Sequence, residues 1–576
     1  MIEFLSANMA PVIFVAMVAF MLLGYPVAFA LAANGIFFGL VGIELGLLQP
    51  SLFGAMPERI FGVMGNETLL AIPFFTLMGL ILERSGMAED LLDTIGQLFG
   101  PIRGGLAYAV VFVGALLAAT TGVVAASVIS MGLISLPIML RYGYDRRLAS
   151  GVIAASGTLA QIIPPSLVLI IMADQLGRSV GDMYKGAFIP GFVLSSLYVG
   201  YILLVTLFKP QFAPALPPEA RSFREPNGKT GSTSLLILTA VSVAGALAFA
   251  ESLPEETATD ETIVLAMMVG ISIAFAASVI NRLFKIGMLS AMAEKVTFVL
   301  IPPLALIFLV LGTIFLGVAT PTEGGAMGAT GALIMAISRK RLTLPLLKQA
   351  MNSTLKLTSF VVFILVGARV FSLTFYGVDG HRWVEHLLLD LPGGEIGFLI
   401  VVNVMVFLLA FFLDFFELSF IVVPLLGPVA EKLGIDLIWF GVLLAVNMQT
   451  SFMHPPFGFA LFYLRSVAPA KEYLDKLTGR KIAPVTTMQI YWGAVPFVCI
   501  QIIMVAIVIA FPQLVTGSFD KDIVVDLDKV QIEVPMGDYG APPPFETPAM
   551  DGQSAPAEED PGKAILESMQ KDGGSQ

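Results

Sequence analysis

Long apolar segments recur along this chain and restrict it to a membrane-embedded fold. Segments such as 11–31, 106–140 and 488–511 carry few charges and are long enough for helices that cross a bilayer. They are too continuous, and too rich in Gly and Ala, for the ten-residue alternating strands of an outer-membrane barrel. With 57% hydrophobic and 13% charged residues, the chain also differs from soluble domains. We therefore predict an all-α polytopic membrane protein.

Two of the apolar segments are interrupted by adjacent prolines. Pro164-Pro165 follow the polar stretch Ser156–Thr158, and Pro455-Pro456 follow the polar stretch Asn447–Ser451. A proline inside a helix removes one backbone hydrogen bond and blocks another, at a cost of about 3 kcal/mol, and lipid supplies no water to replace them. Either the prolines only kink two helices, or each pair marks an unwound stretch with a function.

The two breaks belong to an internal repeat with a constant offset. Pro137–Asp145 ("PIMLRYGYD") matches Pro428–Asp436 ("PVAEKLGID") at Pro, Gly and Asp, 291 positions apart, and the same offset carries one Pro-Pro pair onto the other. A second match, which starts at Leu22 and Phe315, has an offset of 293. Matched breaks in a duplicated membrane protein are typical of secondary transporters, whose discontinuous helices meet near the membrane centre.

A run of apolar residues with polar residues in its middle precedes each break. The runs are 106–140, which contains Thr120–Gly122, and 398–432, which contains Asp414 and Glu417 on one face if the run is helical. Each run is either one long span or a re-entrant hairpin of two half-helices. Basic residues flank the first run and mostly acidic residues flank the second, so the positive-inside rule favours hairpins that enter from opposite faces, as an inverted repeat requires.

These features divide the chain into two repeats, an insertion and a tail. We predict a first repeat at 1–231 with a hairpin at about 106–140 and a broken helix at about 148–174, an inserted helix pair at 232–290, a second repeat at 291–512 with a hairpin at about 398–432 and a broken helix at about 438–465, and a tail at 513–576. From Gly517 onward there are thirteen Asp and Glu but four Lys. That composition predicts an acidic, disordered tail.

At this point the chain resembles a known family, the large permease subunit of tripartite ATP-independent periplasmic (TRAP) transporters. The resemblance rests on "GALLAATTGVVAASV", "GYDRRLASGVIAASGTLAQIIPPS", "GVATPTEGGAMGA" and "LGIDLIWFGVLLAVNMQTSFMHPPFGFALF" and runs over most of residues 1–512. The inserted helix pair, the tail and "FLDFFELSF" are similar to a DctM-like subgroup with longer permeases.

The resemblance implies an elevator fold of the ion-transporter superfamily, with inverted repeats, two re-entrant hairpins and two unwound helices. It implies Na⁺-coupled import of an organic acid across the bacterial inner membrane, with a small four-helix membrane subunit and a periplasmic solute-binding protein as partners. No other cofactor and no nucleic acid is expected. The last helix would deliver the acidic tail to the periplasm, because basic residues precede that helix.

The resemblance implies a candidate site at the two hairpin centres and the two breaks, because these parts bind Na⁺ and substrate in that family. Na⁺ takes oxygen ligands from hydroxyls and freed carbonyls, although hydroxyls in membrane helices also bond to their own backbone. The candidate sodium ligands are Thr120, Thr121, Gly122, Ser127, Ser156, Gly157, Thr158, Pro164, Asp414, Asn447, Thr450, Ser451 and Pro455. The candidate substrate contacts are Thr121, Arg369, Glu417 and His454.

Two of the substrate candidates have an alternative interpretation. Arg369 is a lone basic residue in an apolar segment, and it either meets a substrate carboxylate or extends its charge to the interface. His454 stands where the family often has Thr, and it is either a group that titrates near neutral pH or a passive substitution.

Other functions compete with a tripartite importer. A stand-alone symporter or antiporter of the same superfamily would need no partner. An intramembrane enzyme would need a nucleophile and a base; Ser451 and His454 are three residues apart, but the unwound stretch and the missing nucleophile motif argue against catalysis. A channel is disfavoured because the sequence shows no selectivity filter. We expect a transporter and no enzymatic activity.

Overall fold

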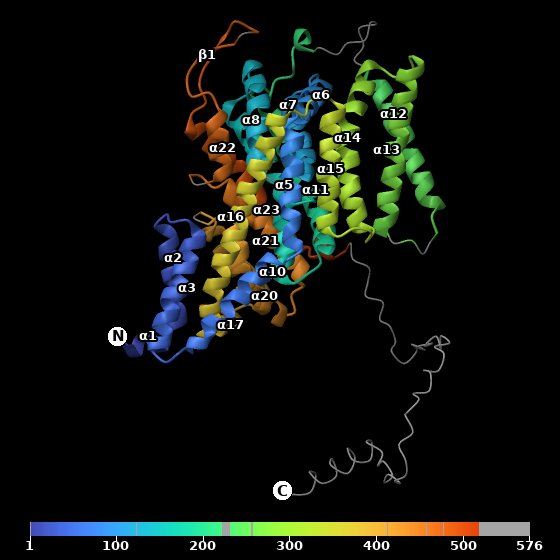
Figure 1. Ribbon diagram of the computed structural model, residues 1–576. Coiled ribbons are helices and arrows are strands. Elements are labelled where there is room, and N and C mark those ends of the chain that lie inside the picture. Colours follow the sequence, from blue (N-terminus) through green and yellow to red (C-terminus); the bar gives the residue numbers. More distant parts are fainter. Residues whose placement is uncertain are drawn as a thin grey trace, which may run out of the picture. The chain divides into compact units, whose positions relative to one another are not determined.

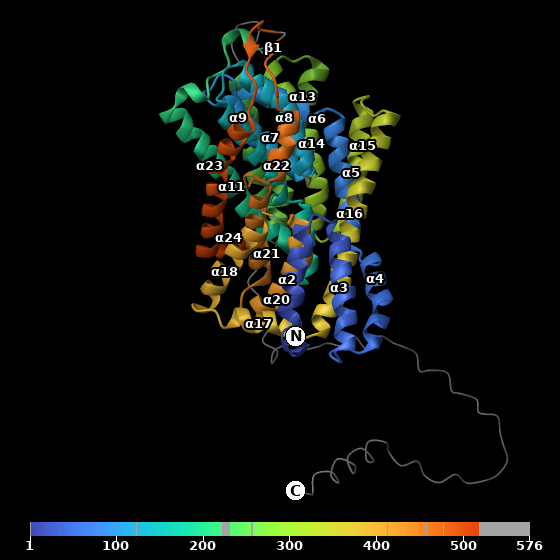
Figure 2. The same ribbon diagram turned by 90° about the vertical axis from the view of Figure 1, so that its left-hand side faces the viewer.

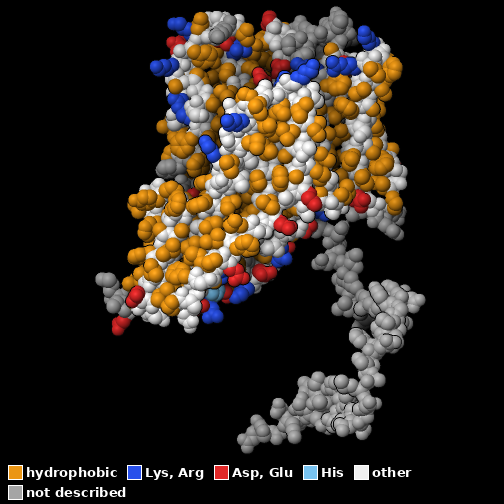
Figure 3. All heavy atoms as spheres, viewed as in Figure 1, with side chains coloured by type: hydrophobic (Ala, Val, Ile, Leu, Met, Phe, Trp, Pro, Cys, Tyr) orange, Lys and Arg blue, Asp and Glu red, His pale blue; other side chains and the backbone are white. Residues whose placement is uncertain are grey.

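The fold is predominantly helical in the part of the chain that the structure covers. The computed structural model describes residues 2–121, 124–221, 231–254, 257, 259–411, 413–456, 458–475 and 477–517. Among these residues, eight helices are long and apolar enough to cross a membrane, or up to ten if each of two bent pairs counts as one span. The prediction of an all-α polytopic membrane protein is confirmed. A broad apolar surface separates two charged edges, with most of the visible basic residues at the upper edge (Figure 3).

The first half of the chain supplies eleven of the described helices (Figure 1). They are α1 (Ile2–Ala7), α2 (Met9–Leu22), α3 (Val27–Glu44), α4 (Met56–Met64), α5 (Ala71–Arg84), α6 (Met87–Phe99), α7 (Gly105–Thr121), α8 (Val124–Arg141), α9 (Arg146–Thr158), α10 (Leu167–Leu176) and α11 (Val180–Phe208). Two further helices, α12 (Ser232–Ser252) and α13 (Thr259–Phe284), follow. They pack against each other, and α13 also packs on α14.

The second half repeats the pattern. Its helices are α14 (Ala291–Phe315), α15 (Pro321–Ser338), α16 (Leu344–Gly377), α17 (Gly380–Leu389), α18 (Gly394–Leu409), α19 (Phe415–Glu417), the π-helical turn η6 (Leu418–Val422), α20 (Val423–Lys432), α21 (Leu437–Met448), α22 (Phe459–Val467), α23 (Thr487–Ala510) and α24 (Gln513–Thr516). The bounds of α8 recur in the second half at an offset of 291: α19 begins at Phe415 and α20 ends at Lys432. The helix bounds thus follow the offset found in the sequence.

One pair of equivalent segments differs in shape. The first half has a bend of 48° between the segments 50–64 and 68–84, whereas α16 is one helix of 34 residues. At the bend, the side-chain oxygen of Asn66 accepts hydrogen bonds from the backbone N–H groups of Thr68 and Leu69, at 2.9 and 3.3 Å. Such local side-chain bonds compete with the helical ladder. The equivalent residue in α16 is Ser359, which stays helical.

The helices form two packed groups, which Figure 2 shows side by side. In the outer group, α5 packs on α15 and α3 packs on α16. In the break group, α9 packs on α7, α8 and α23, and α10 packs on α21. Glycines allow the closest approaches: a Cβ on Gly35 of α3 would lie 2.7 Å from the Val370 carbonyl oxygen of α16. Small residues bring membrane helices together in this way because lipid competes for apolar contacts.

Both long apolar runs are divided into separate helices. The run 106–140 forms two helices, α7 and α8, that pack against each other. The run 398–432 also forms two arms, α18 and α19–α20, rather than one straight span. The loop before α23 contains a short antiparallel strand pair, β1 (Tyr473–Leu474) and β2 (Lys481–Ile482), which the sequence did not predict. The tail beyond residue 517 lies outside the described residues.

Candidate functional site

The first break is built from caps at both ends. Asp145 starts α9, because its carboxylate accepts from two backbone N–H groups of the first turn, at 2.9 and 3.1 Å. α9 ends in a 3-10 turn, η3 (Leu159–Gln161), and the chain then passes Pro164-Pro165. Ser166 caps α10: its hydroxyl donates to the Gln161 carbonyl at 2.5 Å and accepts from a backbone N–H at 3.2 Å. The chain is therefore ordered where it leaves the helix.

The second break has the same construction. Asp436 starts α21 by accepting from the Trp439 backbone N–H at 2.7 Å. α21 ends in a 3-10 turn, η7 (Gln449–Phe452), and Pro455-Pro456 precede α22. Both Pro-Pro peptide bonds are cis. The structure thus contains a helix break at each of the two places where the sequence predicts one.

The two breaks meet through a direct side-chain contact. Gln449 Nε2 donates to Thr158 Oγ1 at 3.1 Å, and Thr158 Oγ1 donates to the Ala155 carbonyl at 2.8 Å. Thr158 and Gln449 are both fully buried. They lie 291 positions apart, so each occupies the equivalent place in its own repeat. The unwound stretches of both halves therefore converge on one point in the interior.

Several hydroxyl and amide oxygens of the two breaks are buried near this contact in the sequence. Thr450 donates its hydroxyl proton to the Asn447 carbonyl at 2.6 Å, and Ser451 donates to the Met448 carbonyl at 2.6 Å. Both hydroxyl protons are used in these bonds, so the hydroxyl oxygens retain lone pairs for a cation. The Ser156 hydroxyl and the Gln449 carbonyl oxygen are buried and have no hydrogen-bond partner among the described residues. Unpartnered buried oxygens are costly unless something binds them.

Asn447 has a structural partner instead of a free side chain. Its amide nitrogen donates to the backbone carbonyl of Asn403 at 2.8 Å and to the Asn403 side-chain oxygen at 3.0 Å. Asn403 lies on α18 and donates to the Leu399 carbonyl. Through this bond, α18 is held against α21 at the second break. The side-chain oxygen of Asn447 is not engaged in these bonds.

The first hairpin packs closely against the first break. A Cβ on Gly114 of α7 would lie 2.6 Å from Ser156 Cβ, and one on Gly157 would overlap Val128 of α8. Both glycines are therefore needed for α7 and α8 to reach the break. Ser127 is buried in α8. The side chains of Thr120 and Thr121, and the whole of Gly122, lie outside the described residues.

At the tip of the second hairpin, the two carboxylates bind the backbone. The Asp414 side chain accepts from the Glu417 N–H at 3.0 Å, and the Glu417 side chain accepts from the Asp414 N–H at 3.0 Å. This reciprocal pattern is a capping box. It places Asp414 before the first helical residue, so the two carboxylates do not project from one face of a regular helix. They fix the tip of the hairpin.

His454 lies in an aromatic pocket just before Pro455. Its ring centroid is 4.2 Å from that of Phe407 and 4.3 Å from that of Phe411. The residue is 1% exposed, and neither ring nitrogen has a hydrogen-bond partner among the described residues. His454 therefore joins α18 to the second break by ring packing, and its two nitrogens stay available to a ligand.

Arg369 lies on another part of α16 than the residue that reaches the second hairpin. Phe360 of α16 reaches the second hairpin, where its ring centroid is 6.0 Å from that of Phe416. Arg369 follows nine residues later, which is about 13 Å along the helix and half a turn away from that face. It lies near Tyr376 together with Arg59 of α4. The sequence placed Arg369 near the substrate only through its isolation in an apolar segment.

Sequence reasoning missed three polar residues of the site. They are Gln161 and Gln449 in the 3-10 turns and Asn403 on α18. Both glutamines lie inside the broken segments, and an amide in an apolar membrane segment was the signal that could have found them. Both polar side-chain atoms of Gln161 are buried without a partner among the described residues. The site is thus richer in amide groups than the hydroxyl pattern indicated.

Comparison with known families settles the class of protein. Residues 14–514 match the sequence model of the family described as "Tripartite ATP-independent periplasmic transporter, DctM component". The chain belongs to this DctM family. As a member, it is a TRAP transporter large permease and not an enzyme. The resemblance seen in the sequence is confirmed.

Curated relatives agree with this assignment. The chain is 27% identical to the C4-dicarboxylate TRAP transporter large permease protein DctM of Pseudomonas aeruginosa, over 74% of this chain and 84% of the relative. It is also 27% identical to the protein of the same name from Vibrio cholerae, over 79% of this chain and 88% of the relative. Among solved structures, the YdaH transporter of Alcanivorax borkumensis matches 80% of this chain and 88% of its own, at 13% identity and a TM-score of 0.43.

Proposed function

We propose that this DctM-family permease imports an organic acid by Na⁺-coupled secondary transport. The observation that supports this most is the meeting of the two helix breaks at Thr158 and Gln449. Secondary transporters place ion and substrate sites where discontinuous helices of two repeats meet, since unwound backbone and half-helix ends coordinate ions there. The position of the contact inside the membrane-spanning bundle suits such a site.

The chemistry of the breaks suits Na⁺. Hard cations take several oxygen ligands, and the hydroxyls of Thr158, Thr450 and Ser451 present lone pairs after donating their protons to backbone carbonyls. Ser156 Oγ and Gln449 Oε1 add two buried oxygens without partners among the described residues. In this proposal, Na⁺ binds these oxygens and the neighbouring carbonyls. Asp414 and Glu417 shape the hairpin tip that encloses the ion.

An elevator movement of the break group past the outer group would expose the site to either side in turn. The described residues show polar as well as apolar contacts between the groups. One is the bond from Asn66 Nδ2, at the bend before α5, to Asp174 Oδ1 of α10, at 2.6 Å. Apolar packing also joins them, such as that between Phe360 and Phe416. Apolar surfaces with few directional bonds allow sliding between two positions.

Membrane orientation and partners follow from charge and family. The basic loops that contain Arg141, Arg146 and Arg147 belong in the cytoplasm by the positive-inside rule. This orientation sends the chain after α24 to the periplasm of a bacterial inner membrane. A small four-helix membrane subunit and a periplasmic solute-binding protein complete the tripartite system. Relatives that are named for C4-dicarboxylates favour a carboxylate as the cargo.

Reconstituted transport tests the proposal. The permease with its small membrane subunit is placed in proteoliposomes, and uptake of a labelled C4-dicarboxylate is measured with and without an added binding protein. An inward Na⁺ gradient should be required, and uptake should fall to background when K⁺ replaces Na⁺. Full uptake without Na⁺ would refute the coupling. Full uptake without the binding protein would favour a stand-alone carrier.

A further inference from the structure

A second pair of buried polar residues extends the Thr158 contact into α11 and α23. Gln501 Nε2 of α23 donates to the Tyr198 hydroxyl of α11 at 2.9 Å, and the Tyr198 hydroxyl also hydrogen-bonds to the Thr158 side chain. All three residues are fully buried. Tyr198 and Gln501 lie outside the two breaks, and the Na⁺ site proposed above does not use them. A hydrogen-bonded chain therefore runs from α23 through α11 to the first break.

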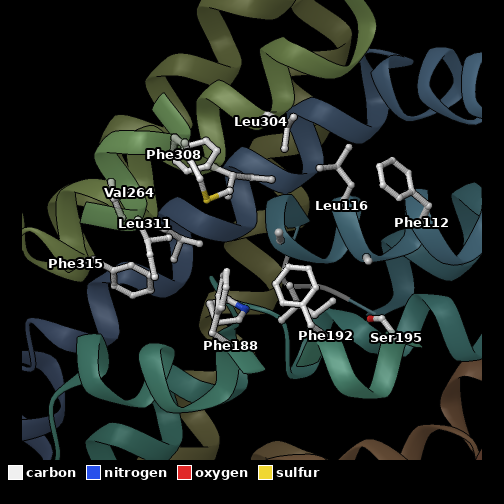
Figure 4. Close-up of a pocket in the computed structure, with 18 of the residues that line it drawn as sticks. Phe112, Leu116, Phe188, Phe192, Ser195, Val264, Leu304, Phe308, Leu311 and Phe315 are labelled. Atoms are coloured by element: carbon white, nitrogen blue, oxygen red, sulfur yellow. The ribbon is translucent and has the colours of Figure 1, made fainter. Parts of the chain in front are cut away.

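The Tyr198 ring is held in place by packing. Its centroid lies 5.2 Å from that of Phe497 on α23, and the two rings meet edge to face. α11 also borders a large apolar cavity, which Phe192 and Ser195 help to line (Figure 4), but Tyr198 is not part of that lining. The hydroxyl of Tyr198 is thus held between Thr158 of α9 and Gln501 of α23.

The direction of each hydrogen bond in this chain follows from the protons available. Thr158 donates its single hydroxyl proton to the Ala155 carbonyl at 2.8 Å, so it can only accept from Tyr198. The Tyr198 oxygen accepts from Gln501, and its own proton is therefore the one that bonds to Thr158. A hydroxyl oxygen has two lone pairs, and Gln449 occupies the other one at 3.1 Å. The lone pair that a cation needs on Thr158 is occupied as long as Tyr198 donates to it.

Gln501 offers the Tyr198 proton a second acceptor. The side-chain oxygen of Gln501, Oε1, is buried and has no hydrogen-bond partner among the described residues. Half a turn of the amide exchanges Oε1 with Nε2, and the two ends of the group have nearly the same shape. Tyr198 would then donate to Oε1 instead of Thr158. This exchange keeps Tyr198 hydrogen-bonded and frees one lone pair of Thr158.

We propose that Tyr198 and Gln501 form a switch that sets whether Thr158 can bind the coupling ion. In one arrangement, which this structure shows, Tyr198 donates to Thr158 and closes it to a cation. In the other, Tyr198 donates to the turned Gln501 amide and Thr158 is open. Both are positioning residues, because they act through Thr158 and do not touch the ion. The inference rests on the proposed function, since it assigns these residues to the Na⁺ site.

Binding of radiolabelled Na⁺ to the purified permease with its small membrane subunit distinguishes the switch from ordinary packing. Tyr198→Phe keeps the ring but removes the proton that closes Thr158, so the dissociation constant for Na⁺ should fall about fivefold, the order of one net hydrogen bond. Tyr201→Phe is the matched control, because the Tyr201 ring makes the same type of contact with Phe497, at 5.1 Å. A purely structural role for Tyr198 predicts weaker binding or no change, and either result would refute the switch.

Gln501 should act in the opposite direction. Gln501→Met removes the second acceptor, so the Tyr198 proton stays on Thr158 and the dissociation constant for Na⁺ should rise about fivefold. The double variant should bind Na⁺ as tightly as Tyr198→Phe alone, because the proton that the amide would accept is absent. Weaker binding in the double variant than in Gln501→Met would show that the two residues act only by packing.

Thermal unfolding in Na⁺-free choline buffer tests the hydrogen-bonded chain without the ion. Tyr198→Phe, Thr158→Val and the double variant form a cycle, and the two changes should be coupled, since each removes one partner of the same bond. Additive effects would overturn the chain. If the wild type binds Na⁺ but the variants do not shift in opposite directions, only the switch fails. If the wild type binds no Na⁺, the proposed function fails, and the switch has no ion to control.

Discussion

Gln449 donates a hydrogen bond to Thr158, and these two residues occupy equivalent positions of the two repeats, 291 apart. The bond lies where the broken helices of both halves approach each other. A twofold axis that related the two repeats would pass close to this pair. The two breaks are thus in direct contact through this bond.

Removing one partner of this hydrogen bond should lower the stability of the protein more than removing both partners. Thr158→Val leaves the buried amide nitrogen of Gln449 without an acceptor, which costs about 1–3 kcal/mol. Thr158→Val with Gln449→Met removes both polar partners and should be milder than the sum of the single changes. Thermal unfolding of the purified complex measures this. Thr239→Val on α12, whose hydroxyl donates to the Leu235 carbonyl of the same helix, serves as the control, and strict additivity would contradict a direct coupling.

Removing the unpartnered hydroxyl of Ser156 should weaken Na⁺ binding. Each lost oxygen ligand is expected to raise the half-saturating Na⁺ concentration about tenfold, which corresponds to about 1.4 kcal/mol. Uptake at varied Na⁺ in proteoliposomes compares Ser156→Ala and Thr158→Ala with Thr239→Ala. Because Ser156 makes no hydrogen bond to the described residues, Ser156→Ala should barely change stability. An unchanged Na⁺ dependence would remove the first break from the ion site.

The sequence predicted the positions of the two helix breaks but not the contact between them. Pro164-Pro165 and Pro455-Pro456 are local signals with a fixed backbone consequence, and the structure has its breaks there. The pairing of Thr158 with Gln449 depends on how two distant segments pack, which no local pattern encodes. Asp414 illustrates an intermediate case. The spacing Asp-x-x-Glu fits a capping box as well as two carboxylates on one helical face. The sequence therefore contained the signal for the helix cap but did not distinguish it from a shared face.

The capping box makes it possible to distinguish a role of Asp414 as a helix cap from a role as an ion ligand. Asn caps helices about as well as Asp, whereas Ala costs about 0.5–2 kcal/mol. Asp414→Asn should therefore keep most of the uptake, while Asp414→Ala should lose a large part of it by loosening the hairpin tip. Initial uptake rates at saturating Na⁺ give the comparison. If the Asn variant is as impaired as the Ala variant, the negative charge itself is needed and Asp414 is an ion ligand.

Arg369→Gln should leave substrate affinity nearly unchanged. The side chain lies about 13 Å along α16 from Phe360 and half a turn from the face that meets the second hairpin. We expect the half-saturating substrate concentration to change less than about twofold, because this side chain would contribute no energy to substrate binding. Kinetics of binding-protein-dependent uptake measure it. His454→Thr, at the second break, is the comparison that should alter the same constant, and a large effect of Arg369→Gln would return that residue to the substrate site.

The loop between α22 and α23 should respond to acid through Asp475. Its carboxylate accepts from the Thr478 hydroxyl at 2.6 Å and pairs with Arg141 of α8 at 2.9 Å. Hydrogen bonds from Thr478, and then the Arg141 guanidinium, hold the pKa of Asp475 below its usual value despite burial. Because the pKa of Asp475 is lower in the folded loop than in the unfolded chain, its ionised carboxylate stabilises the folded loop at pH values above the unfolded-state pKa. That stabilisation disappears as the pH falls through the lower, folded-state pKa.

The loop should therefore stay attached to α8 at neutral pH and detach below about pH 4. A spin label at Leu477→Cys, which is an exposed position, reports its mobility in a Cys499→Ser background. Asp475→Asn has no charge to lose, so its loop should be mobile at every pH and show no acid transition. A transition of equal size in the Asn variant would show that another group controls the loop.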